Sequence, residues 1–297
     1  MRTPSFNEVR YLVESACVIQ SQDSKLDVDG KLVYLKEKGE AVIIGDLHGD
    51  INSLELILKD SDIEKRLRQE DQYLICLGDY IDRGPAQIQV FYRLLSLLEK
   101  YPEQVILLNG NHEGPYDLRR RGHLSVSDFA NQIIRTYPNR DELSLERGFW
   151  KLYSRLYTGC VIDNQALLVH GGIPVEASTL NEVAWAHLYQ KHPESTYYEQ
   201  ILWNDPSLLR GRQYSFRGVG CMFGVDLASL FLEENGLKII IRGHECYDEG
   251  YFFHDDKVLT LFSCKLPVYR NKNIAYLSMP LDLDFTKENL LEHLHQL

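Results

Sequence analysis

The chain has 297 residues, of which 44% are hydrophobic and 25% are charged, so it is long and apolar enough to enclose a large core. Its formal net charge of −11 argues against a nucleic-acid or anionic-membrane partner, because no basic field would attract phosphate groups. No run of about 18 apolar residues predicts a membrane span. Six scattered cysteines without a CxxC pair, and no apolar leader near the N-terminus, favour a reduced, cytoplasmic protein without a signal peptide.

Apolar periodicity predicts a β-α-β-α-β arrangement in the first part of the chain. The expected elements are a leading helix at about 1–20, a short strand at 31–35, a strand at 41–45, a helix at 51–58, a strand at 72–77, a helix at 86–99 and a strand at 104–108. Polar loops follow the last three of these strands. Open α/β sheets bind their ligands at this carboxyl edge.

The second part of the chain begins with a change in character. From about 114 to 157, frequent Arg and Asp residues and apolar residues at helical spacing predict an insertion of helices. The elements expected after it are a strand within 160–170, a mixture of helix and loop over 175–235, and strands at 238–241, 251–253, 258–262 and 274–277. No linker or low-complexity tract divides the chain, so we expect one domain over residues 1–297 with two packed sheets.

Two segments leave alternatives open. The basic run Arg119–Arg121 is either a solvated helix face or a binding site for acidic residues that flank a phosphorylated residue. In the C-terminal tail, about 283–297, Leu290, Leu291, Leu294 and Leu297 are at helical spacing after Thr286, which could cap the helix. That tail could pack against the body or dock a partner.

Three short motifs dominate the sequence: Gly45–Asp50, Gly78–Gly84 and Gly110–Glu113. Each follows an expected strand, and successive motifs are about one βαβ unit apart. Their carboxylate, amide and imidazole side chains are ligands that divalent transition metals accept. Taken singly, these residues have ordinary alternatives. Asp46 could be a helix N-cap, Asp79 a turn residue, Asn111 a loop former and His170 a buried, hydrogen-bonded histidine.

The three motifs resemble the signatures of the PPP family of metal-dependent serine/threonine protein phosphatases, in the calcineurin-like metallophosphoesterase superfamily. Further resemblances follow in family order, at His170–Gly172, Leu202–Pro206, Arg217–Gly218 with Phe223–Gly224, Arg242–Glu245 and Thr260–Ser263. The motifs extend over about residues 41–277. The chain departs from the family at Asn109, where an arginine is usual, and in the loop around 264–271, so it resembles a divergent member.

The resemblance implies a fold and a metal site. The fold is an α/β metallophosphoesterase sandwich of two mixed β-sheets flanked by helices, with a dinuclear metal site at the carboxyl ends of strands. Two divalent ions are expected, manganese first, with iron or zinc as alternatives. One ion would be held by Asp46, His48 and Asp79, and the other by Asp79, Asn111, His170 and His244, with Asp79 as the bridge.

The resemblance also implies a reaction, in which a metal-bridging hydroxide attacks phosphoserine or phosphothreonine directly. His112 would be the general acid, and Asp82 would orient it. Arg83 and Arg217 would hold the phosphoryl group, and Tyr269 would lie over the site. The expected partners are phosphoprotein substrates, and a regulatory subunit is a further candidate. The alternatives are a hydrolase of diadenosine tetraphosphate or another small phosphoester, and a non-catalytic scaffold that binds phosphoproteins.

Overall fold

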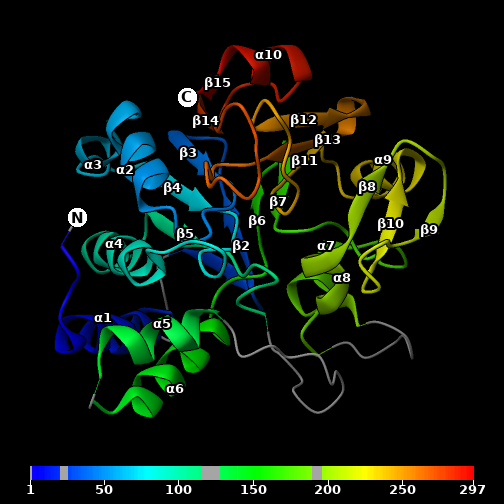
Figure 1. Cartoon of the computed structure of the whole chain (residues 1–297). Coiled ribbons are helices and arrows are strands. Elements are labelled where there is room, and N and C mark those ends of the chain that lie inside the picture. The colour runs from blue at the N-terminus through cyan, green and yellow to red at the C-terminus, as the bar shows by residue number, and fades with distance from the viewer. Residues whose placement is uncertain (1, 21–25, 115–127, 139, 189–195) are drawn as a thin grey trace.

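The computed structural model describes residues 2–20, 26–114, 128–138, 140–188 and 196–297, and two mixed β-sheets form its centre (Figure 1). The larger sheet orders its strands as β1 (Asp27–Asp29), β2 (Leu32–Leu35), β6 (Gly159–Ile162), β7 (Ala166–Val169), β11 (Ile239–Arg242), β13 (Val258–Leu261) and β12 (Tyr251–His254). The smaller sheet orders its strands as β15 (Leu294–Gln296), β14 (Ala275–Pro280), β3 (Glu40–Ile44), β4 (Gln72–Cys76) and β5 (Val105–Leu107). The expected sandwich of two mixed sheets is confirmed.

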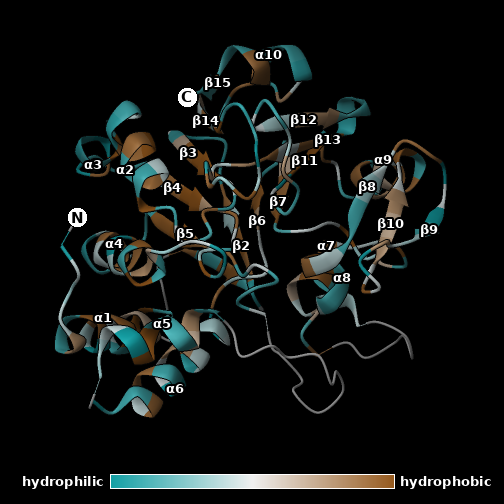
Figure 2. Cartoon of the chain, in the orientation of Figure 1, coloured by the Kyte–Doolittle hydropathy of each residue, from teal (hydrophilic) through white to brown (hydrophobic). Residues whose placement is uncertain are grey.

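Apolar side chains on both faces of each sheet build three layers of core. On β3, Ala41 and Ile43 lie in the cluster between the two sheets, whereas Val42 and Ile44 lie in the cluster beneath the helices. Successive side chains of a strand point to opposite faces, so a sheet covered on both sides must be apolar on both. Figure 2 accordingly shows the central strands among the most apolar segments of the chain.

Helices cover the outer face of each sheet. Those packed on the five-stranded sheet are α1 (Phe6–Ile19), α2 (Ile51–Asp60), α3 (Ile63–Arg66), α4 (Gln87–Lys100), α5 (Asp128–Thr136) and α6 (Glu142–Tyr153). Those packed on the seven-stranded sheet are α7 (Leu180–Ala184), α8 (Tyr197–Trp203) and α9 (Val225–Glu234). Among the described residues, no helix is both long enough and apolar enough to cross a membrane.

The elements expected in the first part of the chain are confirmed, and the helical insertion contains α5 and α6. One region differs. A third sheet, ordered β8 (Asp205–Ser207), β10 (Cys221–Gly224) and β9 (Arg212–Tyr214), occupies part of the stretch expected to be helix and loop. Strands this short are too brief for periodicity to reveal. The basic run Arg119–Arg121 lies outside the described residues, and the single-domain organisation stays a prediction.

The C-terminal tail forms a shorter helix than its leucines indicated. Thr286 caps α10 (Lys287–Glu292) as expected, by accepting a hydrogen bond from the backbone N–H of Asn289. The helix then ends, and β15 pairs with β14. The expectation of helix through Leu297 was wrong, because the free edge of β14 offers backbone partners that a helix cannot use. Leu290 is buried in the core between the sheets, so the tail packs against the body. A short 3-10 helix, η1 (Asp255–Lys257), completes the fold.

Candidate active site

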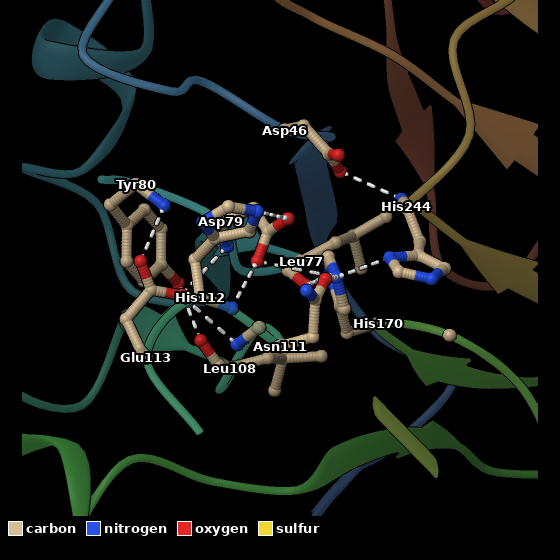
Figure 3. Close-up of polar contacts among 12 residues, drawn as sticks. Asp46, Leu77, Asp79, Tyr80, Leu108, Asn111, His112, Glu113, His170 and His244 are labelled. Atoms are coloured by element: carbon tan, nitrogen blue, oxygen red, sulfur yellow. Dashed lines mark hydrogen bonds and ion pairs between the residues drawn. The ribbon is translucent and has the colours of Figure 1, made fainter. Parts of the chain in front are cut away.

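The six side chains predicted as metal ligands meet at the carboxyl ends of five strands. Figure 3 labels all of them except His48. They follow β3, β4, β5, β7 and β11 and so come from both sheets: Asp46 with His48, Asp79, Asn111, His170 and His244. All six are buried. A parallel backbone bridge between Asp46 and Phe262, which follows β13, joins the two sheets at this edge.

The backbone of the site is strained at several of these residues. His48, Asp79, Asp82 and His244 have φ values of 44°, 55°, 63° and 72°. Side chains other than glycine rarely adopt this left-handed region, and each such residue costs on the order of 1 kcal/mol or more. The surrounding packing must therefore hold the loops in place.

Glycine permits the loops after β4 and β5 to touch. A Cβ atom at Gly110 would lie 2.2 Å from the backbone nitrogen of Asp79 and 2.2 Å from its Oδ1 atom. Any larger residue at position 110 would displace Asp79, so the motif requires glycine for steric reasons.

Asp79 lies between two groups of ligand atoms. Its Oδ2 atom is 3.5 Å from Nε2 of His48, and its Oδ1 atom is 3.4 Å from Nε2 of His170. The side chains of His48, Asp79 and His112 form one group that could hold a metal ion, and those of Asp79, His170 and His244 form another. Asp79 thus offers one oxygen to each group, which is the geometry of a bridging carboxylate.

Backbone carbonyls orient two of the histidines. Nδ1 of His48 lies 2.8 Å from the carbonyl oxygen of Ile81, and Nδ1 of His170 lies 2.9 Å from that of Leu77. A carbonyl can only accept, so each Nδ1 carries a hydrogen, and each ring in its neutral form presents the lone pair of Nε2 to the centre of the site. Metal-ligating histidines are commonly held in this way.

The nitrogen and oxygen atoms that converge at the site include more hydrogen-bond acceptors than the nearby donors can satisfy. Nε2 of His170 lies 2.9 Å from Oδ1 of Asn111, and both atoms are acceptors when the His170 ring is neutral. Among the described residues, Oδ2 of Asp46 and Nε2 of His244 are buried without a hydrogen-bond partner. Convergent lone pairs with orphaned buried acceptors fit a cation site, and the Asp, Asn and His donors suit divalent transition metals.

For two residues of the site, neighbouring charges shift the pKa in the direction opposite to the effect of burial. Burial alone would lower the pKa of His48, but the carboxylates of Asp46 and Asp79 raise it to about 9. Burial alone would raise the pKa of Asp79, but the neighbouring histidines hold it well below its usual value. Burial and the charges of His170 and Arg242 hold the pKa of His244 well below its usual value, which favours the neutral ring that a metal requires.

His112 lies at the edge of this cluster and pairs with Asp82. Its Nδ1 atom is 2.7 Å from Oδ2 of Asp82, and its Nε2 atom is 4.0 Å from Oδ2 of Asp79. Asp82 is itself held by the backbone N–H of Phe129, which donates to Oδ1 at 3.2 Å. The side chain of His112 is 17% exposed, whereas that of His48 is 4% exposed, so Nε2 of His112 is more accessible to a bound molecule.

The three predicted substrate-binding residues differ from one another in how they lie relative to the site. Arg217 donates to Oδ2 of Asp205 at 2.7 Å and to the backbone carbonyl of His244 at 3.4 Å, so it adjoins the site. The ring of Tyr269 stacks beside that of His48, with centroids 5.5 Å apart. Arg83 is exposed on the loop that carries Asp82 and makes no hydrogen bond or ion pair to another described residue.

Residues 41–248 match the model of the calcineurin-like phosphoesterases. The chain belongs to this family. The match extends from β3, which leads into the first motif, to the residues just after His244, so it includes all six predicted ligands.

Other relatives carry phosphatase names. A probable serine/threonine-protein phosphatase of Encephalitozoon cuniculi is 33% identical over 236 residues, which are 78% of this chain and 48% of that protein. This chain therefore spans about half the length of that relative. A protein serine/threonine phosphatase from Saccharomyces cerevisiae is similar in structure, with a TM-score of 0.75 and 22% identity over 93% of this chain and 83% of the other. A cold-active protein-tyrosine phosphatase of a Shewanella species gives a TM-score of 0.52 and 18% identity over 89% and 82%. The structural likenesses show a shared fold.

Glu113 has a positioning role in this phosphoesterase that its sequence alone did not reveal. Its fully buried carboxylate accepts four backbone N–H groups, from Asp79 at 2.9 Å, Tyr80 at 2.8 Å, Ile81 at 3.1 Å and Gly110 at 3.2 Å. Burial and the charge of Asp79 raise the pKa of Glu113 to about 7. Its place at the end of the third motif was the available signal, and the contacts show that it ties the loop after β4 to the loop after β5.

Asp205 is a second residue whose importance only the structure shows. Its Oδ1 atom accepts from Nη2 of the fully buried Arg242 at 2.8 Å, and its Oδ2 atom accepts from Nε of Arg217. Asp205 thus links a structural arginine to one that faces the site. At the departure from the family pattern, Asn109 is buried and donates to the carbonyl oxygen of Tyr153 at 3.2 Å and to the hydroxyl of Tyr198.

Proposed function

We propose that this calcineurin-like phosphoesterase is a metal-dependent phosphatase that hydrolyses phosphoserine and phosphothreonine in proteins. The observation that carries the proposal is the Asp82–His112 pair beside the shared carboxylate of Asp79. Serine and threonine alkoxides are poor leaving groups, so their departure requires a positioned proton donor. The name of the Encephalitozoon relative supports the same substrate class.

The contacts among the six predicted ligands suggest how they would be shared between two ions. Asp46, His48 and Asp79 would hold one ion, and Asp79, Asn111, His170 and His244 would hold the other. Two bound ions would lower the pKa of water toward neutrality and neutralise charge on the phosphoryl oxygens. We propose manganese first, with iron and zinc as alternatives, because Asp, Asn and His ligands suit all three.

The arginines would bind the phosphoryl group. A guanidinium can donate two parallel hydrogen bonds to phosphoryl oxygens and stays charged at any ordinary pH. Asp205 holds the Nε side of Arg217 and leaves part of its fork at the site. Arg83, with no partner among the described residues, is free to turn toward a bound phosphate. Tyr269 would limit the access of water on the side of His48.

The proton transfer would run through His112. As the oxygen of a hydroxide bonds to phosphorus and the ester P–O bond breaks, Nε2 of His112 would give its proton to the departing serine or threonine oxygen. The proton released when the attacking water ionised would later restore the imidazolium. Asp82 accepts the hydrogen on Nδ1, which fixes the orientation of the ring and stabilises the charge of the imidazolium. The products are an unmodified hydroxyl side chain and inorganic phosphate.

Paired initial rates would test the proposal. We would add manganese and compare phosphate release from phosphoserine and phosphothreonine peptides with cleavage of diadenosine tetraphosphate, using His112→Asn as the control. Peptide hydrolysis that the variant loses would support a protein phosphatase. Cleavage of the dinucleotide alone would overturn the proposed substrate. Two bound metals without turnover of either compound would favour the non-catalytic scaffold.

A further inference from the structure

Two aromatic side chains beside the site are almost completely exposed. Tyr214, at the end of β9, is 95% exposed, and Phe216, two residues later, is 99% exposed. Single exposed apolar residues are common on protein surfaces, but adjacent exposed aromatic rings usually mark a place of interaction. These two rings have the highest exposed fractions of any large hydrophobic residue in the described part of the chain.

Both rings come from one short stretch of backbone. β9 is an edge strand of the three-stranded sheet and ends at Tyr214. Phe216 follows in a turn, in which the backbone N–H of Gly218 donates to the carbonyl of Ser215 at 3.2 Å. Tyr214 and Phe216 are therefore two exposed rings at the point where the strand enters this turn, and we call the pair the aromatic ledge.

The aromatic ledge continues directly into the candidate active site. Phe216 precedes Arg217, so the Cα atoms of the two residues are about 3.8 Å apart. The guanidinium of Arg217 reaches the backbone carbonyl of His244, one of the six predicted ligands. A phosphoryl group bound by Arg217 would thus lie close to the ledge. A peptide that carries that group advances about 3.3 Å per residue when extended, so its neighbouring side chains would come within reach of the two rings.

We propose that the aromatic ledge binds an apolar side chain of the substrate, a few residues from the phosphorylated serine or threonine. This inference rests on the proposed function and adds a sequence preference to it. Aromatic rings offer a large contact area with few rotatable bonds, so little conformational entropy is lost when they bind. Tyr214 and Phe216 would therefore be specificity-determining residues.

The charges near the ledge favour an apolar occupant over a charged one. The two arginines that precede the rings in sequence are paired: Arg210 lies 3.8 Å from Asp226, and Arg212 lies 3.2 Å from Glu176. Their charges are therefore largely neutralised at this surface. The connection from β8 to β9 adds Leu208 and Leu209, which are 65% and 69% exposed.

Matched phosphopeptides would test the inference. With manganese present, we would measure kcat/KM for phosphothreonine peptides that carry Leu or Ser at each of the few positions on either side of the phosphothreonine. The variants are Tyr214→Ser and Phe216→Ser, and the control is Tyr11→Ser, an exposed tyrosine on α1 that is 59% exposed. Hydrolysis of 4-nitrophenyl phosphate, which has no flanking residues, reports on the catalytic centre alone.

We expect the wild-type protein to prefer Leu at one of these positions by about tenfold, which corresponds to about 1.4 kcal/mol. Phe216→Ser should abolish that preference by raising KM for the Leu peptide, and it should leave 4-nitrophenyl phosphate hydrolysis unchanged. Tyr11→Ser should change neither quantity. Peptide hydrolysis without a preference, or an equal loss on 4-nitrophenyl phosphate in Phe216→Ser, would overturn the inference alone. Hydrolysis of 4-nitrophenyl phosphate but of no phosphopeptide would overturn the proposed function and the inference with it.

Discussion

The carboxylate of Asp82 lies 2.7 Å from Nδ1 of His112, while Nε2 of the same ring lies 4.0 Å from the shared carboxylate of Asp79. One side of the imidazole is therefore occupied by a partner that holds it, and the other side faces the metal ligands. This arrangement distinguishes His112 from His48 and His170, whose Nδ1 atoms face backbone carbonyls and not a carboxylate. It also yields a prediction that distinguishes proton donation from metal binding.

We expect His112→Asn to lower kcat on phosphoserine peptides by roughly 10²- to 10⁴-fold, because the leaving oxygen loses its proton donor. The loss on 4-nitrophenyl phosphate should be much smaller, since that leaving group departs without a proton. Metal content, measured by inductively coupled plasma mass spectrometry, should match the wild type. Loss of metal in the variant would instead make His112 a ligand, as its membership of one metal group allows.

Asp79 should be required at both metal positions, because its two oxygens face different groups of ligands. We expect Asp79→Ala to lose both ions at metal concentrations that saturate the wild type. The Oδ2 atom of Asp46 lies 3.6 Å from Nε2 of His48, and its Oδ1 atom accepts from the backbone N–H of His244 at 2.8 Å, so Asp46→Ala should weaken one ion more than the other. The measurement is the number of metal ions bound per protein after dialysis. Equal losses of metal in the two variants would contradict a bridge at Asp79.

Asp205 should contribute strongly to stability, because it pairs with a fully buried arginine. Its removal by Asp205→Ala leaves the charge of Arg242 with less compensation, and loss of one partner of a buried pair costs about 3–5 kcal/mol. The control is Asp256→Ala, whose exposed ion pair with Lys287 should contribute little, because water and salt screen it. Urea unfolding of both variants gives the comparison. Arg242 also donates to Glu245 at 2.8 Å and to the backbone carbonyls of Gly171 and Asn204. A loss at Asp205 no larger than that at Asp256 would show that these partners suffice for Arg242.

His254 should make the protein less stable in mild acid. Burial, and then the charge of Arg242, lower its pKa from 6.5 to about 3 in the folded state. Below pH 6.5 the unfolded chain binds a proton that the folded chain does not, so the free energy of unfolding falls with pH until the folded pKa is reached. The loss is at most about 2 kcal/mol by pH 5, at about 1.4 kcal/mol per pH unit.

The variant His254→Gln removes that titration and keeps a side chain able to meet the hydroxyls of Tyr247 and Thr260. We expect its free energy of unfolding to fall less than that of the wild type between about pH 7 and pH 5. Urea unfolding at several pH values measures both slopes. Parallel slopes in the two proteins would show that His254 does not cause the acid sensitivity.

Several features of the site could be predicted because they are local. A strand that ends in a polar loop is visible as an apolar run before the motif, and this held for β3, β4 and β5. The alternative interpretation of Asp46 as a helix N-cap is excluded, because another residue occupies that position. Asp50 caps α2, because its Oδ1 atom accepts from the backbone N–H of Ser53 at 3.1 Å. Asp46 does not cap the helix, and its Oδ2 atom is buried at the site without a hydrogen-bond partner among the described residues.

Other features depend on contacts between distant segments, which periodicity does not report. Glu113 was part of a motif without a role, and four backbone N–H groups from two loops now give it one. The leucines at the end of the chain followed helical spacing, yet Leu294 belongs to β15 because β14 offered an edge. The three-stranded sheet, and with it the ledge beside Arg217, had no signal strong enough to be predicted.

The sequence by itself predicted which residues would hold metals, donate a proton or bind phosphate, because the resemblance of its motifs to a known family implies these roles. Only the tertiary structure decided that Asp79 faces two groups at once, that backbone carbonyls turn His48 and His170 inward, and that Asp205 connects Arg217 to Arg242. The physical reason is that bridging, tautomer and ion pairing depend on distances of a few ångströms between atoms far apart in the chain. Such distances are set when the two sheets pack, and no local pattern encodes them.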